Sequence, residues 1–127
     1  YLTNPIILCC SLSCLESQLG CQPFQVNKEF LGLGDKSLVI DDCLKFFRIL
    51  DEALLQSKFQ ISRKKVEYYD PNTFNGTLTL HHKDIEYSWQ NEYRILIAPS
   101  EADYKNIPIK GLKGISTIVN TSDLRYL

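Results

Sequence analysis

Residues 41–58, DDCLKFFRILDEALLQSK, are the most regular part of the sequence and constrain the fold most strongly. Apolar residues recur there at three- and four-residue steps, which is the period of one face of an α-helix. The members of this stripe are Leu44, Phe47, Leu50 and Leu54. Asp41 or Asp42 can cap the N-terminus of such a helix. We predict an amphipathic helix over about residues 41–57 that covers a sheet rather than serving as a binding surface for a partner.

The rest of the sequence contains the short alternating or β-branched runs that are typical of strands. The runs are residues 5–12, 37–40, 64–70, 76–82, 92–99 and 115–120. The segment 71–76, PNTFNG, has the turn residues of a hairpin connection. We therefore predict an α+β fold with a mixed or mostly antiparallel sheet, covered by the one helix, in a single domain over residues 1–127.

Composition limits the classes of partner. The chain has 14 basic and 15 acidic residues and a formal net charge of -1, so a polyanion would have to be bound by a local group of cations. Apolar runs stay well short of the roughly 18 residues that span a bilayer, so we expect no membrane partner. The sequence begins at Tyr1 and contains no Met, which leads us to expect a fragment of a longer chain. An N-terminal half or a protein partner could then complete a site.

The cysteines indicate the compartment. There are five, an odd number, and the chain has no secretory signal, so we expect free thiols and a cytoplasmic protein. The cysteines are Cys9, Cys10, Cys14, Cys21 and Cys43. Cys10 and Cys14 have the spacing of one pair of zinc ligands, but Cys21 has no near partner. We therefore predict no metal site, and a secreted protein remains an alternative if disulfides form.

The stretch 89–97, WQNEYRILI, holds the first group of candidate site residues. Side chains alternate along a strand, so Glu92 and Arg94 share one face, while Tyr93, Ile95 and Ile97 share the other. We expect this second face to be buried against the stripe of the predicted helix. The pair Glu92 and Arg94 has two interpretations. It is either an exposed ion pair of little energetic consequence or a site in which Arg94 binds a phosphate or carboxylate.

In the second interpretation, Glu92 orients Arg94 or acts on a bound hydroxyl group, and Trp89 and Tyr93 restrict water nearby. His81 and His82 are adjacent, so in a strand their rings point to opposite faces. We expect one ring to point inward and the other to be solvated, with a catalytic or anion-binding role for His82 as the alternative.

Basic residues supply the remaining candidates. Lys83 follows the histidines, and Arg63 and Lys65 lie in a basic run that leads to Tyr68. Aromatic residues interleaved with basic ones can stack on bases, although such a segment is also typical of a solvated strand. The candidate binding residues are Lys83, Tyr68, Trp89, Arg63 and Lys65.

Several short motifs, taken in order, resemble the C-terminal half of a prokaryotic family of unknown function. The matching positions are Ser11-Leu12-Ser13, Gly32-x-Gly34, Val66-x-Tyr68, Lys83 and Glu92-Tyr93-Arg94. The chain departs from the family at Gln90, where the family has the first carboxylate of a Glu-x-Glu-x-Arg motif. The upstream half of the family is also missing here. Members often occur near mobile-element and defence genes, and their layout is similar to that of ADP-ribosyltransferase-like domains.

The resemblance implies an enzyme domain directed at a nucleotide or a nucleic acid, with NAD or another nucleotide as the ligand. Its catalytic candidates are Glu92, Arg94 and His82. The alternative is a non-catalytic binding or interaction module, in which the Glu-x-Arg strand face serves only structure and partner contact.

Overall fold

The computed structural model describes residues 6–13, 16, 19, 26–57, 59–98 and 107–124. Its strands and α-helix are β1 (Ile6–Ser11), β2 (Lys36–Ile40), α2 (Cys43–Gln56), β3 (Gln60–Lys65), β4 (Glu67–Tyr69), β5 (His82–Asp84), β6 (Glu92–Ala98) and β7 (Ser116–Asn120). Short 3-10 helices are η1 (Lys28–Gly32), η2 (Ile85–Gln90), η3 (Leu112–Ile115) and η4 (Thr121–Asp123). In the part of the chain that is described, no helix is both long and apolar enough to cross a membrane.

Strand β6 is the centre of the fold. It lies between β1 and β3 and pairs antiparallel with both, while β2 pairs antiparallel with β7 and β4 pairs parallel with β5. The predicted α+β class and mostly antiparallel pairing are confirmed, but the described strands form three separate sheets rather than the single sheet predicted. The runs predicted at residues 5–12, 37–40, 92–99 and 115–120 all contain strands, with ends that differ by no more than one residue.

Helix α2 begins where the sequence predicts, because the Asp42 side chain accepts a hydrogen bond from the Lys45 backbone N–H at 2.9 Å. Its buried residues are Phe46, Leu50 and Leu54. The prediction that Leu44 belongs to the buried stripe is wrong, since this residue is 76 % exposed. At 3.6 residues per turn, Leu44 lies about 120° around the helix axis from Leu50 and Phe46 only about 40°, so Phe46 takes the place in the core.

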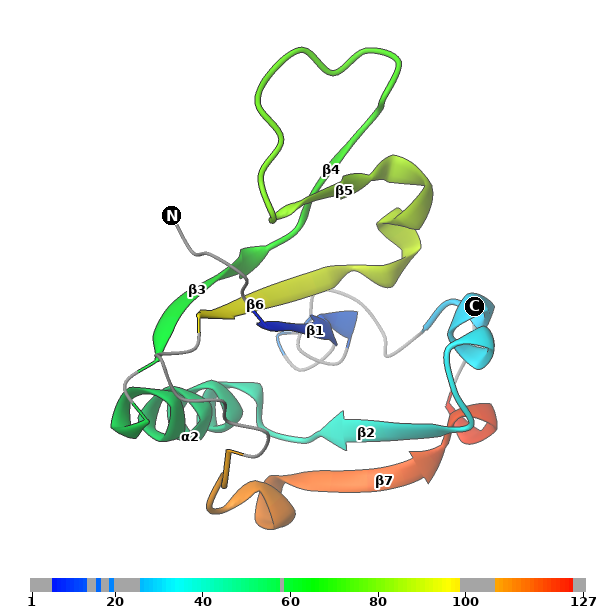
Figure 1. The fold of residues 1–127 in the computed structure, drawn as a ribbon. Helices are drawn as coiled ribbons and strands as arrows, with labels where there is room; N and C mark the ends of the chain where they lie inside the picture. The colour runs from blue at the N-terminus through cyan, green and yellow to red at the C-terminus, as the bar shows by residue number, and fades with distance from the viewer. Residues whose placement is uncertain are drawn as a thin grey trace.

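The two faces of β6 meet different parts of the chain. Ile95 and Ile97 are buried in one cluster with the α2 residues, and the Tyr93 ring packs on Phe47 with a centroid distance of 5.0 Å. The predicted burial of this face against the helix is confirmed. Figure 1 shows α2 on one side of β6 and the β4, β5 and η2 segment on the other. This segment covers the face that carries Glu92 and Arg94.

The region between β3 and β5 differs from the sequence prediction. The run predicted at 64–70 divides at the buried Val66, whose N–H donates to the Glu92 carbonyl, and the run at 76–82 is strand only from His82. Residues 71–76 do not make a hairpin, because β4 and β5 are parallel and need a crossover connection. Residues 71–80 are exposed, and their alternation therefore follows no buried sheet face.

Candidate functional site

The candidate site begins where η2 turns into β6. Asn91 ends η2 with a φ of 45°, in the left-handed region that Asn tolerates better than most residues. The backbone N–H of Glu92 then donates to the Tyr68 hydroxyl oxygen at 2.9 Å. This contact ties the first residue of β6 to β4 and leaves the phenolic proton of Tyr68 available for another acceptor.

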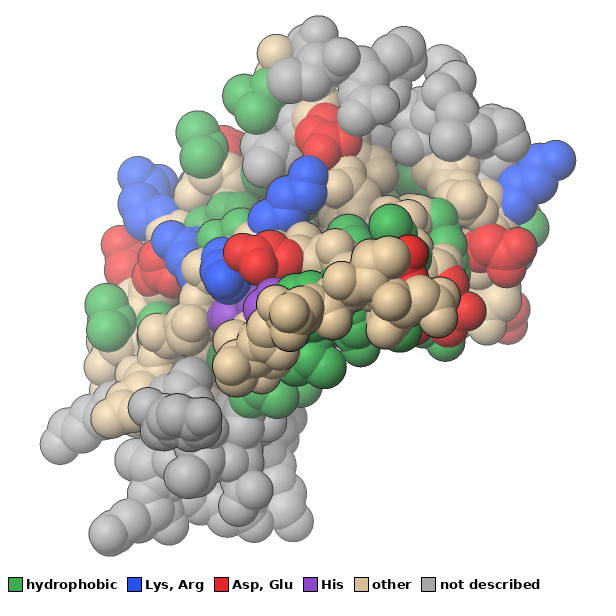
Figure 2. Space-filling model, turned by 90° about the horizontal axis from the view of Figure 1, so that it is seen from above, with side chains coloured by type: hydrophobic (Ala, Val, Ile, Leu, Met, Phe, Trp, Pro, Cys, Tyr) green, Lys and Arg blue, Asp and Glu red, His purple; other side chains and the backbone are tan. Residues whose placement is uncertain are grey.

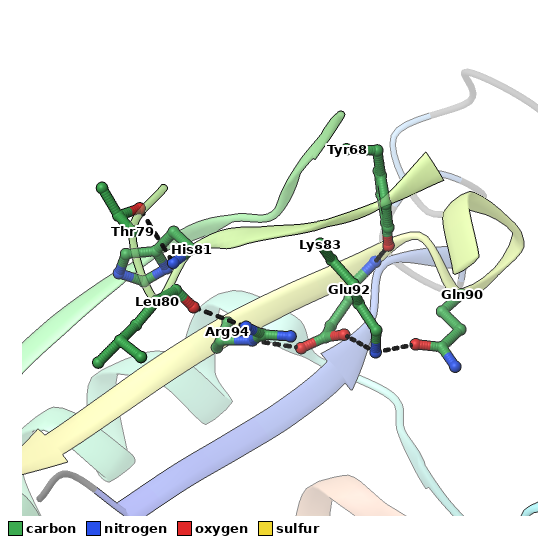
Figure 3. Close-up of polar contacts among 8 residues, drawn as sticks. All are labelled: Tyr68, Thr79, Leu80, His81, Lys83, Gln90, Glu92 and Arg94. Carbon is green, nitrogen blue, oxygen red and sulfur yellow. Dashed lines mark hydrogen bonds and ion pairs between the residues drawn. The ribbon is translucent and has the colours of Figure 1, made fainter. Parts of the chain in front are cut away.

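Glu92 is the centre of a network of charged side chains. Its Oε1 accepts from Arg94 Nε at 2.7 Å, and its Oε2 accepts from Lys83 Nζ at 2.9 Å (Figure 3). Lys83 Nζ also donates to Gln90 Oε1, and Arg94 Nη1 donates to the Leu80 carbonyl at 2.6 Å. Two cations from two strands therefore surround one carboxylate.

This network is buried. Glu92 is 3 % exposed, and the Arg94 and Lys83 side chains are 12 % and 25 % exposed. The interpretation of Glu92 and Arg94 as an exposed ion pair is wrong, because the chain from Leu80 to Gln90 lies over this sheet face. A charge buried in this way must be paired and hydrogen-bonded. Both oxygens of Glu92 meet that requirement.

Electrostatics fix the protonation of the network. Burial alone would raise the pKa of the Glu92 carboxyl, but hydrogen bonds from Arg94, Cys9 and Lys83 lower this pKa to about 2. The hydrogen bond to Glu92 raises the pKa of Arg94. At neutral pH the three groups carry one negative and two positive charges. Glu92 is consequently a poor proton acceptor and a firm anchor for its two cations.

The β4–β5 ladder sorts the remaining predicted residues onto two faces. Tyr68 and Lys83 are register partners, and both side chains reach Glu92. His82 is the partner of Glu67, and its Nε2 lies 3.3 Å from a Glu67 carboxylate oxygen. Its ring packs near those of Tyr69 and Phe74, with centroid distances of 6.3 and 5.5 Å. The structure therefore does not bring His82 into contact with Glu92 or Arg94.

The two histidines differ in their surroundings. One ring was predicted to point inward, and it is that of His81, which is 6 % exposed with Nε2 3.2 Å from Ser62 Oγ. The prediction that the other ring is solvated is wrong, because the His82 side chain is only 12 % exposed and its Nδ1 accepts from the Thr79 N–H at 2.9 Å.

Two predicted binding residues, Arg63 and Lys65, lie away from Glu92. Arg63 pairs with Asp51 at 2.8 Å and stacks over the Phe47 ring on the α2 side of the sheet. Lys65 lies 3.7 Å from Glu16. The basic run is thus divided by strand alternation, since Lys64, and not Arg63 or Lys65, is the register partner of Arg94.

The aromatic residues predicted to restrict water also have other partners. Trp89 packs edge-on against Phe30 at 5.2 Å, and Tyr93 faces α2. Figure 2 shows positive and negative side chains intermixed around the histidines. The site is therefore a compact group of alternating charges rather than a cationic stripe with aromatic walls.

Sequence reasoning missed four contributors to the site. They are Cys9, the Leu80 carbonyl, His81 and Gln90. Cys9 is the register partner of Arg94, and burial, followed by a hydrogen bond with Glu92, raises the pKa of its thiol. Alternation places Cys9 and Cys10 on opposite faces, but only the pairing of β1 with β6 reveals which face meets Glu92.

Residues 6–13, 16, 19, 26–57, 59–98 and 107–124 contain no group of three His, Cys, Asp or Glu side chains that could hold a metal ion. Cys14 and Cys21, which belong to the zinc alternative, lie outside the described residues. Comparisons with protein-family models, curated protein sequences and solved structures found no match to this chain. The family resemblance of the sequence motifs therefore stays a prediction.

Proposed function

We propose that this chain is a cytoplasmic domain that acts on a nucleotide or a nucleic acid, as expected for a component of a prokaryotic defence or mobile-element system. The observation that supports it most is the buried pair of cations, Lys83 and Arg94, held by one carboxylate. The group keeps a net positive charge at neutral pH, and phosphate is an anion that arginine binds with its planar fork and lysine binds as a point charge.

The residues have distinct roles in this proposal. Arg94 binds a phosphate group and Lys83 contributes a second positive charge beside it. Glu92 is a positioning residue, because a carboxyl with a pKa of about 2 holds its cations but accepts a proton poorly. The bonds from Arg94, Lys83 and Cys9 use three of the four acceptor sites of this carboxylate, and the fourth could accept from a ribose hydroxyl. Tyr68 can donate its phenolic proton to the same ligand.

The test is a thermal-shift titration with NAD, ATP, GTP and a short single-stranded RNA. At least one of them should raise the midpoint of the wild type, because a ligand that binds the folded state stabilises it. Arg94→Lys keeps the charge but loses the planar fork and should weaken binding by about tenfold or more. Arg48→Lys makes the same change at an exposed position of α2 and is the matched control. No shift with any of the four ligands would contradict the proposal.

A non-catalytic binding module is the second candidate. It is favoured by two contacts, because Arg94 Nε and Nη1 already have partners within the protein. The two candidates separate when a ligand that gives a thermal shift is incubated with the protein. Slow consumption of that ligand, reduced in Glu92→Gln, supports the enzyme. Binding that depends on Arg94 without any product supports the module.

A further inference from the structure

The segment that accepts the Arg94 Nη1 hydrogen bond is a tight turn that contains two histidines. We call it the histidine turn, Thr79–His82. The His82 N–H donates to the Thr79 carbonyl at 3.1 Å, and the Glu67 N–H donates to the His81 carbonyl at 2.9 Å. At the tip of this turn the Leu80 carbonyl accepts from Arg94 Nη1 (Figure 3). A phosphate that uses this edge of Arg94 must first displace Leu80.

His81 holds the turn on the sheet as a neutral ring. It is 6 % exposed, and its Nε2 and Ser62 Oγ on β3 share a hydrogen bond of 3.2 Å. Its Nδ1 is buried and has no hydrogen-bond partner in the described part of the chain. A second proton on this ring would therefore produce a buried cation with one N–H group unsatisfied, which is costly.

The charges around His81 oppose that proton. Lys64 on β3, Arg94 on β6 and His82 on β5 are the basic groups that act on the ring, and Glu67 on β4 is the acidic one. Glu67 is 59 % exposed and lies 3.3 Å from both Lys64 Nζ and His82 Nε2, so it is already shared. Burial of the ring, followed by Lys64 and Arg94, lowers the pKa of His81.

The turn can move away from the sheet while exposing little additional apolar surface. Residues 71–80 are exposed, and Leu78 and Leu80 are 52 % and 45 % exposed. Segments of this kind open locally with far less free energy than global unfolding requires. Figure 1 shows the long connection between β4 and β5 extending away from the sheet. This connection precedes the turn and can move together with it.

We propose that the histidine turn is an acid-sensitive cover over Arg94, which protonation of His81 expels so that the Nη1 edge of the guanidinium becomes free to bind an anion. The proposal rests on the proposed function, since it assigns regulation to the same site. Acid favours release of the turn, because the released His81 ring binds a proton more readily than the buried ring. The closed turn therefore has its full stability above the ordinary histidine pKa of about 6.5. Below that pH, the equilibrium constant for closing falls by up to about tenfold per pH unit.

The first experiment follows the turn without any ligand, by amide hydrogen exchange of Thr79 and His82 corrected for intrinsic rates. Between about pH 6.5 and 5.5 the wild type should lose about tenfold in protection. His81→Leu, which replaces the titrating ring with an apolar side chain that can still fill the buried position, should show no such loss. His81→Asn serves the same purpose if the leucine variant fails to fold.

His82→Asn is the matched control. Its amide oxygen can accept from the Thr79 N–H as His82 Nδ1 does, so this variant should keep the pH response of the wild type. Equal protection at both pH values in the wild type would overturn the proposal, as would an equal loss in His81→Leu.

The second experiment measures binding of NAD, whose diphosphate is a diester and does not titrate in this range. Its affinity should rise by about tenfold from about pH 7.5 to 5.5 in the wild type and in His82→Asn, but not in His81→Leu. If the turn is released but none of NAD, ATP, GTP and RNA binds at either pH, the proposed function is contradicted. The acid-driven release would still stand. Binding of NAD that ignores pH would overturn the regulatory proposal and leave the proposed function standing.

Discussion

Replacing Glu92 by Gln is the sharpest perturbation of the buried network. The substitution keeps the shape of the side chain but removes the charge that Arg94 and Lys83 share. Removing one partner of a buried pair costs about 3 to 5 kcal/mol when the other charge has no access to water. The Lys83 side chain is 25 % exposed and can recover part of its solvation, so we expect a loss of about 2 to 4 kcal/mol near neutral pH.

The pH dependence gives this prediction a second signature. The pKa of Glu92 falls from 4.5 to about 2 on folding, so its stabilising contribution is complete above the unfolded value and disappears as pH falls through the folded one. At about 1.4 kcal/mol per pKa unit the ceiling is about 3.4 kcal/mol, and screening by water at the Lys83 end lowers it. The difference in stability between wild type and Glu92→Gln should shrink by about 1 to 2 kcal/mol between about pH 6 and pH 3.

Urea unfolding of both proteins across this pH range is the assay. Glu67→Gln is the matched control, since Glu67 makes longer ion pairs and is 59 % exposed, and it should cost no more than about 0.5 kcal/mol. A cost below about 0.5 kcal/mol for Glu92→Gln, or a difference that does not change with pH, would refute the account of the network.

Three further predictions concern the core and the thiols. Leu50→Ala should cost about 2 to 5 kcal/mol in urea unfolding because it leaves a cavity, whereas Leu44→Asp should cost under about 0.5 kcal/mol, and equal costs would contradict the helix orientation. Alkylation mapped by mass spectrometry should modify the exposed Cys9 before Cys10, whose side chain is half-buried and whose pKa is raised to about 11 by burial, and faster labelling of Cys10 would be the contrary result. Thr121→Val should cost about 1 to 3 kcal/mol by calorimetry, because the buried hydroxyl donates to the Gly34 carbonyl, and an unchanged midpoint would disprove this.

The fold was largely predictable because its main signals are local. The period of residues 41–58 predicts α2, and alternation in 92–99 predicts both the strand and the two faces of β6. The exact stripe was less certain, since Phe46 and Phe47 lie about 100° apart on the helix and either can face a sheet. The parallel pairing of β4 with β5 could not be predicted, because nothing local specifies a crossover.

The candidate site was predictable only in its first pair. Alternation places Glu92 and Arg94 together, but their burial depends on the segment from Leu80 to Gln90 folding back over them. That return is a long-range arrangement with no periodic signal. The same reason applies to Lys83 and His82: alternation places these adjacent residues on opposite faces, but only the register with β4 decides that Lys83 meets Glu92.

The most direct test of the central claim follows the guanidinium of Arg94 itself. Protein with ¹⁵N-labelled arginine is titrated with the nucleotide that gives the largest thermal shift, and the Nε and Nη signals of Arg94 and Arg48 are followed together. We expect the Arg94 signals to move saturably, at the ligand concentrations that stabilise the fold, while those of Arg48 on the exposed side of α2 stay in place. Saturable binding that leaves the Arg94 signals unmoved would contradict this expectation.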